Sequence, residues 1–250
     1  MTIHSAPTSE AYPSERPPYP IGVPSKFNLE GDAQIYRGNT TVCHIPPSSP
    51  IIPGLHAVFK TFESHPTLAK YVRLLPPDSW HMTVFDGVRE DECEPGMWPP
   101  GLLKQPLEEA TADFSQRLRK FGRQLEAEGL APPYKMKVRC FEIPAPVGIG
   151  LLVEGATPEE EKRMRRLRDR LSDVLGFRAP NHEIYQFHVT IAYLLHHVDG
   201  ADQVELRSVL NKLLSEFDPE FELGRVEFCT FDTMLAFPRV FYLGDEEGGN

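Results

Sequence analysis

Apolar residues follow two spacings along most of the chain. Short apolar, β-branched runs indicate strands, and apolar residues recurring every three or four positions indicate helices. The predicted strands cover residues 40–45, 79–88, 135–143, 147–155, 186–195, 225–232 and 234–243. The predicted helices cover residues 54–63, 107–128, 157–176 and 203–217. Because hairpins and helices are mixed along the chain, this order predicts an α+β fold with mainly antiparallel sheet.

The third of these helices has the clearest boundaries. Thr157 is a suitable N-cap, Pro158 stands at the first helical position, and acidic residues at 159–161 favour the positive end of the helix dipole. Gly176 supplies the residue that can close the helix in a left-handed conformation. By contrast, residues 1–24 are rich in Pro, Ser and Glu without periodicity, which predicts a disordered Pro-rich tail.

Composition narrows the class of partner. The chain has 250 residues and a formal net charge of -10, which argues against long DNA or RNA but not against a small nucleotide, whose pocket needs only a few cations. The four cysteines are scattered and form no C-x-x-C motif. No secretory signal is evident at the start, and no apolar run approaches the roughly 20 residues that span a membrane. We therefore expect a cytoplasmic protein that does not enter the membrane.

The two most informative motifs are His-x-Thr sequences on separate predicted strands. Side chains alternate between the faces of a strand, so His81 and Thr83 share one face and the apolar residues between and after them point to the other. His188 and Thr190 repeat the arrangement in the second half of the chain. Facing one another, the two strands would present two imidazoles and two hydroxyls in one cleft.

That set of groups suits phosphoryl transfer without a metal. One neutral imidazole can take a proton from water, and the other, as imidazolium, can give one to the leaving oxygen. Threonine hydroxyls can donate hydrogen bonds to the non-bridging phosphate oxygens. We therefore predict His81, Thr83, His188 and Thr190 as catalytic residues.

Two other histidine-containing patterns have simpler explanations. His65-Pro66-Thr67 also fits the string, but the proline makes a central strand unfavourable, so we interpret His65 as a surface or helix-start residue. A metal site could be sought in His182, Glu183, His196 and His197. These residues flank the second motif strand at opposite ends and match no known ligand spacing, so we predict neither a metal nor another cofactor.

Three further residues are candidates for substrate binding. Phe85 shares the alternating face of His81 and Thr83 and could stack on a base, although an ordinary core position explains it equally well. Lys137 lies with Lys135 and Arg139 on one face of a strand and could attract a phosphate, or that face could be solvated. Tyr185 precedes the second motif strand and could reach the ligand.

The motifs resemble those of the two-histidine (2H) phosphoesterase superfamily, which includes RNA ligase-like cyclic phosphodiesterases. Three further stretches are similar to a less characterised fungal and bacterial branch: Gly38-Asn39-Thr40, LPPDSWHMTVFDGV at 75–88 and FHVTIAYLL at 187–195. The resemblance implies one bilobal domain over residues 25–245, with two mainly antiparallel sheets lining a central cleft and helices outside. It also implies His188 as the base and His81 as the acid, while the near-symmetry of the motifs leaves these roles open.

The sequence thus favours a metal-independent enzyme that hydrolyses a 2′,3′-cyclic phosphate, at an RNA terminus or in a small cyclic nucleotide. Another phosphodiester remains an alternative, such as a 1″,2″-cyclic phosphate of ADP-ribose or a 2′,5′-linked oligonucleotide. A nucleotide-monophosphate-binding module with little catalysis is the alternative from another class. The residues do not indicate the oligomeric state.

Overall fold

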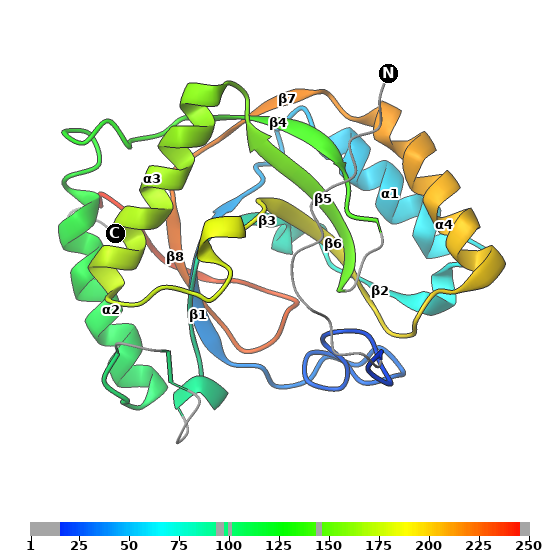
Figure 1. Cartoon of the computed structure of the whole chain (residues 1–250), viewed down its shortest axis with the longest axis horizontal. Coiled ribbons are helices and arrows are strands. Elements are labelled where there is room, and N and C mark those ends of the chain that lie inside the picture. Colours follow the sequence, from blue (N-terminus) through cyan, green and yellow to red (C-terminus); the bar gives the residue numbers. More distant parts are fainter. Residues whose placement is uncertain (1–15, 94–97, 100–101, 144–146, 246–250) are drawn as a thin grey trace.

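A single curled antiparallel sheet forms the centre of the molecule (Figure 1). The computed structural model describes residues 16–93, 98–99, 102–143 and 147–245. Strands in this part run in the order β7-β4-β5-β6-β3-β1-β8-β9, with β2 also beside β6. Their bounds are β1 Gly38–His44, β2 Val72–Leu74, β3 His81–Arg89, β4 Tyr134–Phe141, β5 Gly148–Gly155, β6 His188–Leu194, β7 Glu220–Leu223, β8 Glu227–Phe231 and β9 Arg239–Tyr242.

The two motif strands, β3 and β6, meet in the middle of this order, with three strands beyond each of them. Their pairing is narrow, because Met82 opposite Val189 is its one matched pair. The sequence led us to expect two sheets. The described strands instead form one, because this contact joins a half built on β3 to a half built on β6.

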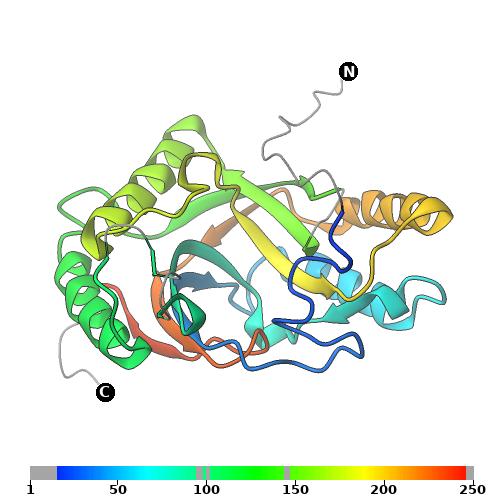
Figure 2. The ribbon, with the colours of Figure 1, turned by 60° about the horizontal axis from the view of Figure 1, so that its bottom comes forward.

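Four α-helices in the described part of the chain cover the sheet from two sides. They are α1 Ile52–Ser64, α2 Leu107–Gly122, α3 Pro158–Leu175 and α4 Gly200–Leu213. Helices α2 and α3 lie together on one side, and α1 and α4 lie together on the other, as both views show (Figure 2). The α+β class and the mainly antiparallel sheet predicted from the sequence are confirmed. No helix in the described part of the chain is long and apolar enough to cross a membrane.

Local sequence signals account for the helix boundaries. The Thr157 side chain accepts a hydrogen bond of 3.2 Å from the backbone N–H of Glu160, and Gly176 ends α3 in the left-handed region at φ 81°. Helix α2 buries a stripe that includes Phe114 and Leu118, as its spacing predicts. It ends at Gly122 instead of 128, and turns that include a left-handed Gly129 carry the chain onward to β4.

Extra residues in β3 and β6 change which side chains face inward. Opposite β1, β3 has one extra residue between Thr83 and Phe85, and opposite β5, β6 has one extra residue between Thr190 and Ala192. Each is a β-bulge, which interrupts the two-residue alternation. The side chain that follows the threonine on the motif face is therefore three residues further on, at Asp86 in β3 and at Tyr193 in β6.

Residues 1–15 of the predicted tail lie outside the described residues, whereas residues 16–24 lie against the folded body. The Arg16 guanidinium pairs with Asp199 at 2.6 Å, and the Pro17 carbonyl oxygen lies 2.8 Å from His197 Nε2. Pro20 is buried. The predicted domain boundary at residue 24 stays a prediction, and these contacts join residues 16–20 to the loop after β6.

Candidate functional site

The two His-x-Thr pairs line one pocket of about 720 Å³. His81 and Thr83 reach it from β3, and His188 and Thr190 reach it from β6. Antiparallel pairing of Met82 with Val189 sets His81 beside Thr190 and Thr83 beside His188. The two imidazoles therefore lie on a diagonal of the pocket wall, each next to a threonine of the opposite strand. The sequence predicted this convergence, and the sheet register is what produces it.

Backbone contacts fix both imidazoles in the same way. His81 Nδ1 lies 2.7 Å from the carbonyl oxygen of Ser79, and His188 Nδ1 lies 2.9 Å from that of Gln186. A carbonyl oxygen can only accept a hydrogen bond, so Nδ1 is the protonated nitrogen in each ring. The other ring nitrogen, Nε2, therefore carries a lone pair when the histidine is neutral and a proton when it is charged.

His81 is held in its neutral form. The ring lies edge-on to Phe237, with centroids 4.2 Å apart, and its centroid is 5.8 Å from that of His44. Burial lowers the pKa of His81 to about 4, and repulsion from His44 and His188 acts in the same direction, against the opposing hydrogen bond to Ser79. Near pH 7, His81 Nε2 therefore carries a lone pair.

Tyr185 lies where the sequence suggested, at the pocket beside the β3 motif. It lines the pocket together with Thr83, and burial raises the pKa of its phenol, so the phenol stays protonated. The guanidinium of Arg168, on α3, lies 3.7 Å from the Tyr185 ring centroid and donates to the carbonyl oxygen of Val84 at the bulge. Arg168 is 1% exposed, and its Nε and Nη2 atoms are buried without a hydrogen-bond partner, so the Tyr185 ring and the Val84 carbonyl replace only part of the hydration of this cation.

The structure does not bring Phe85 or Lys137 to this pocket. Phe85 is fully buried against Phe177 and His182, because the bulge after Thr83 turns it to the core face. Lys137 lies on β4 and pairs with Glu154 of β5 at 3.1 Å. That strand is separated from β6 by β5, so its cation does not line the pocket. Neither residue lines the pocket, and a role of either in substrate binding stays a prediction.

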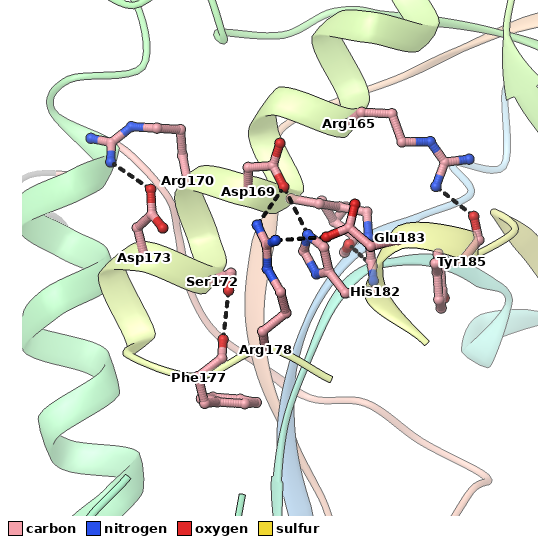
Figure 3. A network of polar contacts seen from close by, with 12 residues as sticks. Arg165, Asp169, Arg170, Ser172, Asp173, Phe177, Arg178, His182, Glu183 and Tyr185 are labelled. Carbon is pink, nitrogen blue, oxygen red and sulfur yellow. Dashed lines mark hydrogen bonds and ion pairs between the residues drawn. The ribbon is translucent and has the colours of Figure 1, made fainter. Parts of the chain in front are cut away.

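Of the residues considered as metal ligands, His182 and Glu183 have other partners (Figure 3). His182 Nε2 lies 2.8 Å from Asp169, and Arg178 bridges Asp169 and Glu183 at 2.9 and 2.6 Å. These contacts hold the loop between α3 and β6, through which Arg178 reaches the pocket edge. His196 is exposed on the loop after β6.

One other group of described residues has metal-ligand chemistry. Atoms of His44, Glu227 and Cys229 lie within 4.8 Å of one another. His44 Nδ1 and a guanidinium nitrogen of Arg239 lie 3.1 and 3.3 Å from the same Glu227 oxygen. The carboxylate is thus already neutralised by the arginine, which an incoming cation would have to displace. The third His-x-Thr, at His65, lies at the C-terminal end of α1, where Nδ1 accepts the backbone N–H groups of Thr67 and Leu68.

The pocket residues that the sequence did not anticipate include two cations and two tyrosines: Lys26, Arg89, Tyr36 and Tyr193. A second register shift in the β1–β3 pairing, between Gly38 and Thr40, turns Arg89 to the pocket face. The bulge in β6 does the same for Tyr193. Lys26 comes from the segment before the first strand. No periodic signal marks any of them, since bulges and loop paths decide their direction.

Two comparisons relate the chain to known proteins. A family model described as "2H-phosphodiest: Domain of unknown function (DUF1868)" matches residues 26–142, which include His81 and Thr83 but end before His188. The fold is similar to the crystal structure of a conserved protein of unknown function, ATU0111, from Agrobacterium tumefaciens str. C58. The TM-score is 0.76 and the identity 27%, over 91% of this chain and 94% of that chain. No curated protein matches the sequence. The family match connects the β3 motif with a 2H-phosphodiesterase-like domain, and the structural match supports the α+β fold over nearly the whole chain.

Proposed function

We propose that the protein hydrolyses a phosphodiester, namely a 2′,3′-cyclic phosphate or a small cyclic nucleotide, by acid–base catalysis without a catalytic metal. The observation that carries the proposal is the matched pair of imidazoles in one pocket. Both bind a backbone carbonyl through Nδ1, so both can direct Nε2 to the same ligand. The hydroxyls of Thr83 and Thr190 line the same pocket as hydrogen-bond donors for the phosphate.

In the proposed reaction, a water oxygen bonds to phosphorus as one ester P–O bond breaks. A neutral histidine takes the proton from water, and an imidazolium gives its proton to the leaving ester oxygen. The product is a phosphomonoester with a free hydroxyl group. Both proton transfers use Nε2, because each Nδ1 is held by a carbonyl.

We assign the base role to His81 and the acid role to His188. Burial of His81 lowers its pKa to about 4, so it has a lone pair ready near neutral pH. This assignment is the reverse of the one that the superfamily resemblance implies. A substrate with a p-nitrophenyl leaving group, which needs little protonation, separates the two. Activity of His188→Ala should recover more than that of His81→Ala, and the opposite order would exchange the roles.

The direct test is hydrolysis of a panel of phosphodiesters with EDTA present, followed by ³¹P NMR. The panel holds nucleoside 2′,3′-cyclic phosphates, an ADP-ribose 1″,2″-cyclic phosphate and a 2′,5′-linked dinucleotide. His81→Ala and His188→Ala should each slow turnover by about 10²–10⁴-fold. The double variant should lose far less than the product of the two losses, because the residues act as a unit.

His65→Ala is the matched control, since His65 belongs to a third His-x-Thr string that does not line the pocket. It should retain wild-type turnover. Tight nucleotide binding without turnover of any member of the panel would replace the enzyme with the nucleotide-binding module. Turnover that EDTA abolishes and zinc restores would transfer the chemistry to a metal, for which His44, Glu227 and Cys229 are the ligands to test first.

A further inference from the structure

A lysine shares the pocket with the two histidines. Lys26 Nζ lies 3.2 Å from the hydroxyl oxygen of Tyr193, 4.9 Å from the Tyr193 ring centroid and 5.2 Å from that of Tyr36. All three residues line the pocket. The ammonium is thus oriented by two aromatic rings, which attract a cation without neutralising it.

Within the described part of the chain, no carboxylate forms an ion pair with Lys26. The neighbouring cation, Arg89, does have carboxylate partners. The Arg89 guanidinium lies 5.0 Å from the Tyr36 centroid and is paired with Asp91 at 3.1 Å and Glu92 at 3.3 Å. The positive charge of Lys26 is therefore not cancelled where it meets the pocket. A partly enclosed cation of this kind suits an anionic group of a ligand.

The ammonium of Lys26 contacts Tyr193, which stands three residues beyond Thr190 on β6. A strand rises about 3.3 Å per residue, so the Cα atoms of Thr190 and Tyr193 are at most roughly 10 Å apart across the bulge. A single phosphate bound beside Thr190 would not extend that far. A nucleotide carries its 5′ substituent on the opposite side of the ribose from the 2′ and 3′ oxygens, and so can reach both places.

We propose that Lys26, with Tyr36 and Tyr193, forms a second anion subsite that binds a 5′-phosphate of the nucleotide whose cyclic phosphate lies between the histidines. This inference rests on the proposed function and specifies its substrate class: a 2′,3′-cyclic nucleotide that also bears a terminal phosphate. The bulge in β6 is what makes the subsite, because it turns Tyr193 to the same face as His188 and Thr190.

The test compares uridine 2′,3′-cyclic phosphate with its 5′-phosphorylated form. The wild-type protein should hydrolyse the 5′-phosphorylated compound with a kcat/KM about ten- to a hundredfold higher, which is what a hydrogen bond to a charged group contributes. In Lys26→Met that ratio should fall to near one. The ratio is measured on one protein preparation, so partial misfolding of the variant cancels from it.

Lys70→Met is the matched control. Lys70 also lies over a tyrosine, 4.8 Å from the Tyr71 centroid, but it does not line the pocket. Its variant should keep the wild-type ratio. A wild-type ratio of one, or a high ratio that persists in Lys26→Met, overturns the subsite while hydrolysis itself still supports the proposed function. Should neither compound be hydrolysed, the ratio of their calorimetric dissociation constants decides the subsite by the same comparison, and turnover of the wider panel decides the proposed function separately.

Discussion

Acid should destabilise this protein through His81. Its pKa is about 4 in the folded protein and 6.5 in an unfolded chain, chiefly because folding buries the imidazole. Between these pH values the unfolded chain takes up a proton at this position and the folded protein does not. Stabilisation by the neutral His81 is therefore complete above pH 6.5 and is lost as the pH falls towards 4.

The size of the effect follows from the two pKa values. They differ by about 2.5, and each pKa unit corresponds to about 1.4 kcal/mol, so protonation of His81 should remove about 3 kcal/mol from the free energy of unfolding. Typical domains have only about 5–15 kcal/mol in total. A loss of about 3 kcal/mol is therefore a measurable fraction of the total, and the protein stays folded at neutral pH, where the loss does not occur.

Urea unfolding followed by circular dichroism between pH 7.5 and pH 4 provides the measurement. Asparagine cannot become charged and can still donate to the Ser79 carbonyl, so His81→Asn removes the titration and keeps a donor. The difference in unfolding free energy between wild type and His81→Asn should change by about 3 kcal/mol across the range. His196→Asn, which replaces an exposed histidine, serves as the control and should follow the wild type at every pH.

Parallel curves for His81→Asn and the wild type would refute the reasoning, because they would mean that the ring remains hydrated in the folded state. The same property enters catalysis. If His81 is the base, the acid limb of kcat/KM reports its pKa in the free enzyme and should lie near pH 4, well below the ordinary value for histidine.

Two further predictions concern the support of the site. Arg168→Met should lower the free energy of unfolding by about 1–3 kcal/mol and reduce kcat, since the Val84 carbonyl and the Tyr185 ring both lose their partner. Urea unfolding and turnover measure these effects. Arg207→Met, at an exposed position on α4, is the control, and an equal effect of the two variants would contradict the prediction. Deleting residues 2–15 should leave the melting temperature nearly unchanged. Deleting residues 2–24 also removes the contacts of residues 16–20, and each kcal/mol of unfolding free energy lost with them should lower the melting temperature by about 2–4 °C. Equal melting temperatures for the two truncations would show that those contacts contribute nothing.

The sequence by itself determined the four helices, most of the strands and the central pair of motifs, but it did not indicate the short strands β2 and β7. Helical spacing and capping residues define α3, and two-residue alternation sets His81 with Thr83 and His188 with Thr190 on the motif faces. These features depend only on near neighbours in the chain. A single residue and the few around it fix which way a side chain points within one regular strand.

Tertiary structure decided where the bulges lie, which further side chains reach the pocket and how deeply His81 is buried. The bulges after Thr83 and Thr190 arise from pairing with β1 and β5, and they move Phe85 to the core and Tyr193 to the pocket. Lys26 is brought to the pocket by the path of the segment before β1, where the sequence predicted no helix or strand. Burial of His81, which sets its pKa, likewise depends on side chains distant in the sequence. Strand pairing, loop path and burial depend on residues that meet only after folding. The pattern of neighbouring residues in the sequence therefore does not predict them.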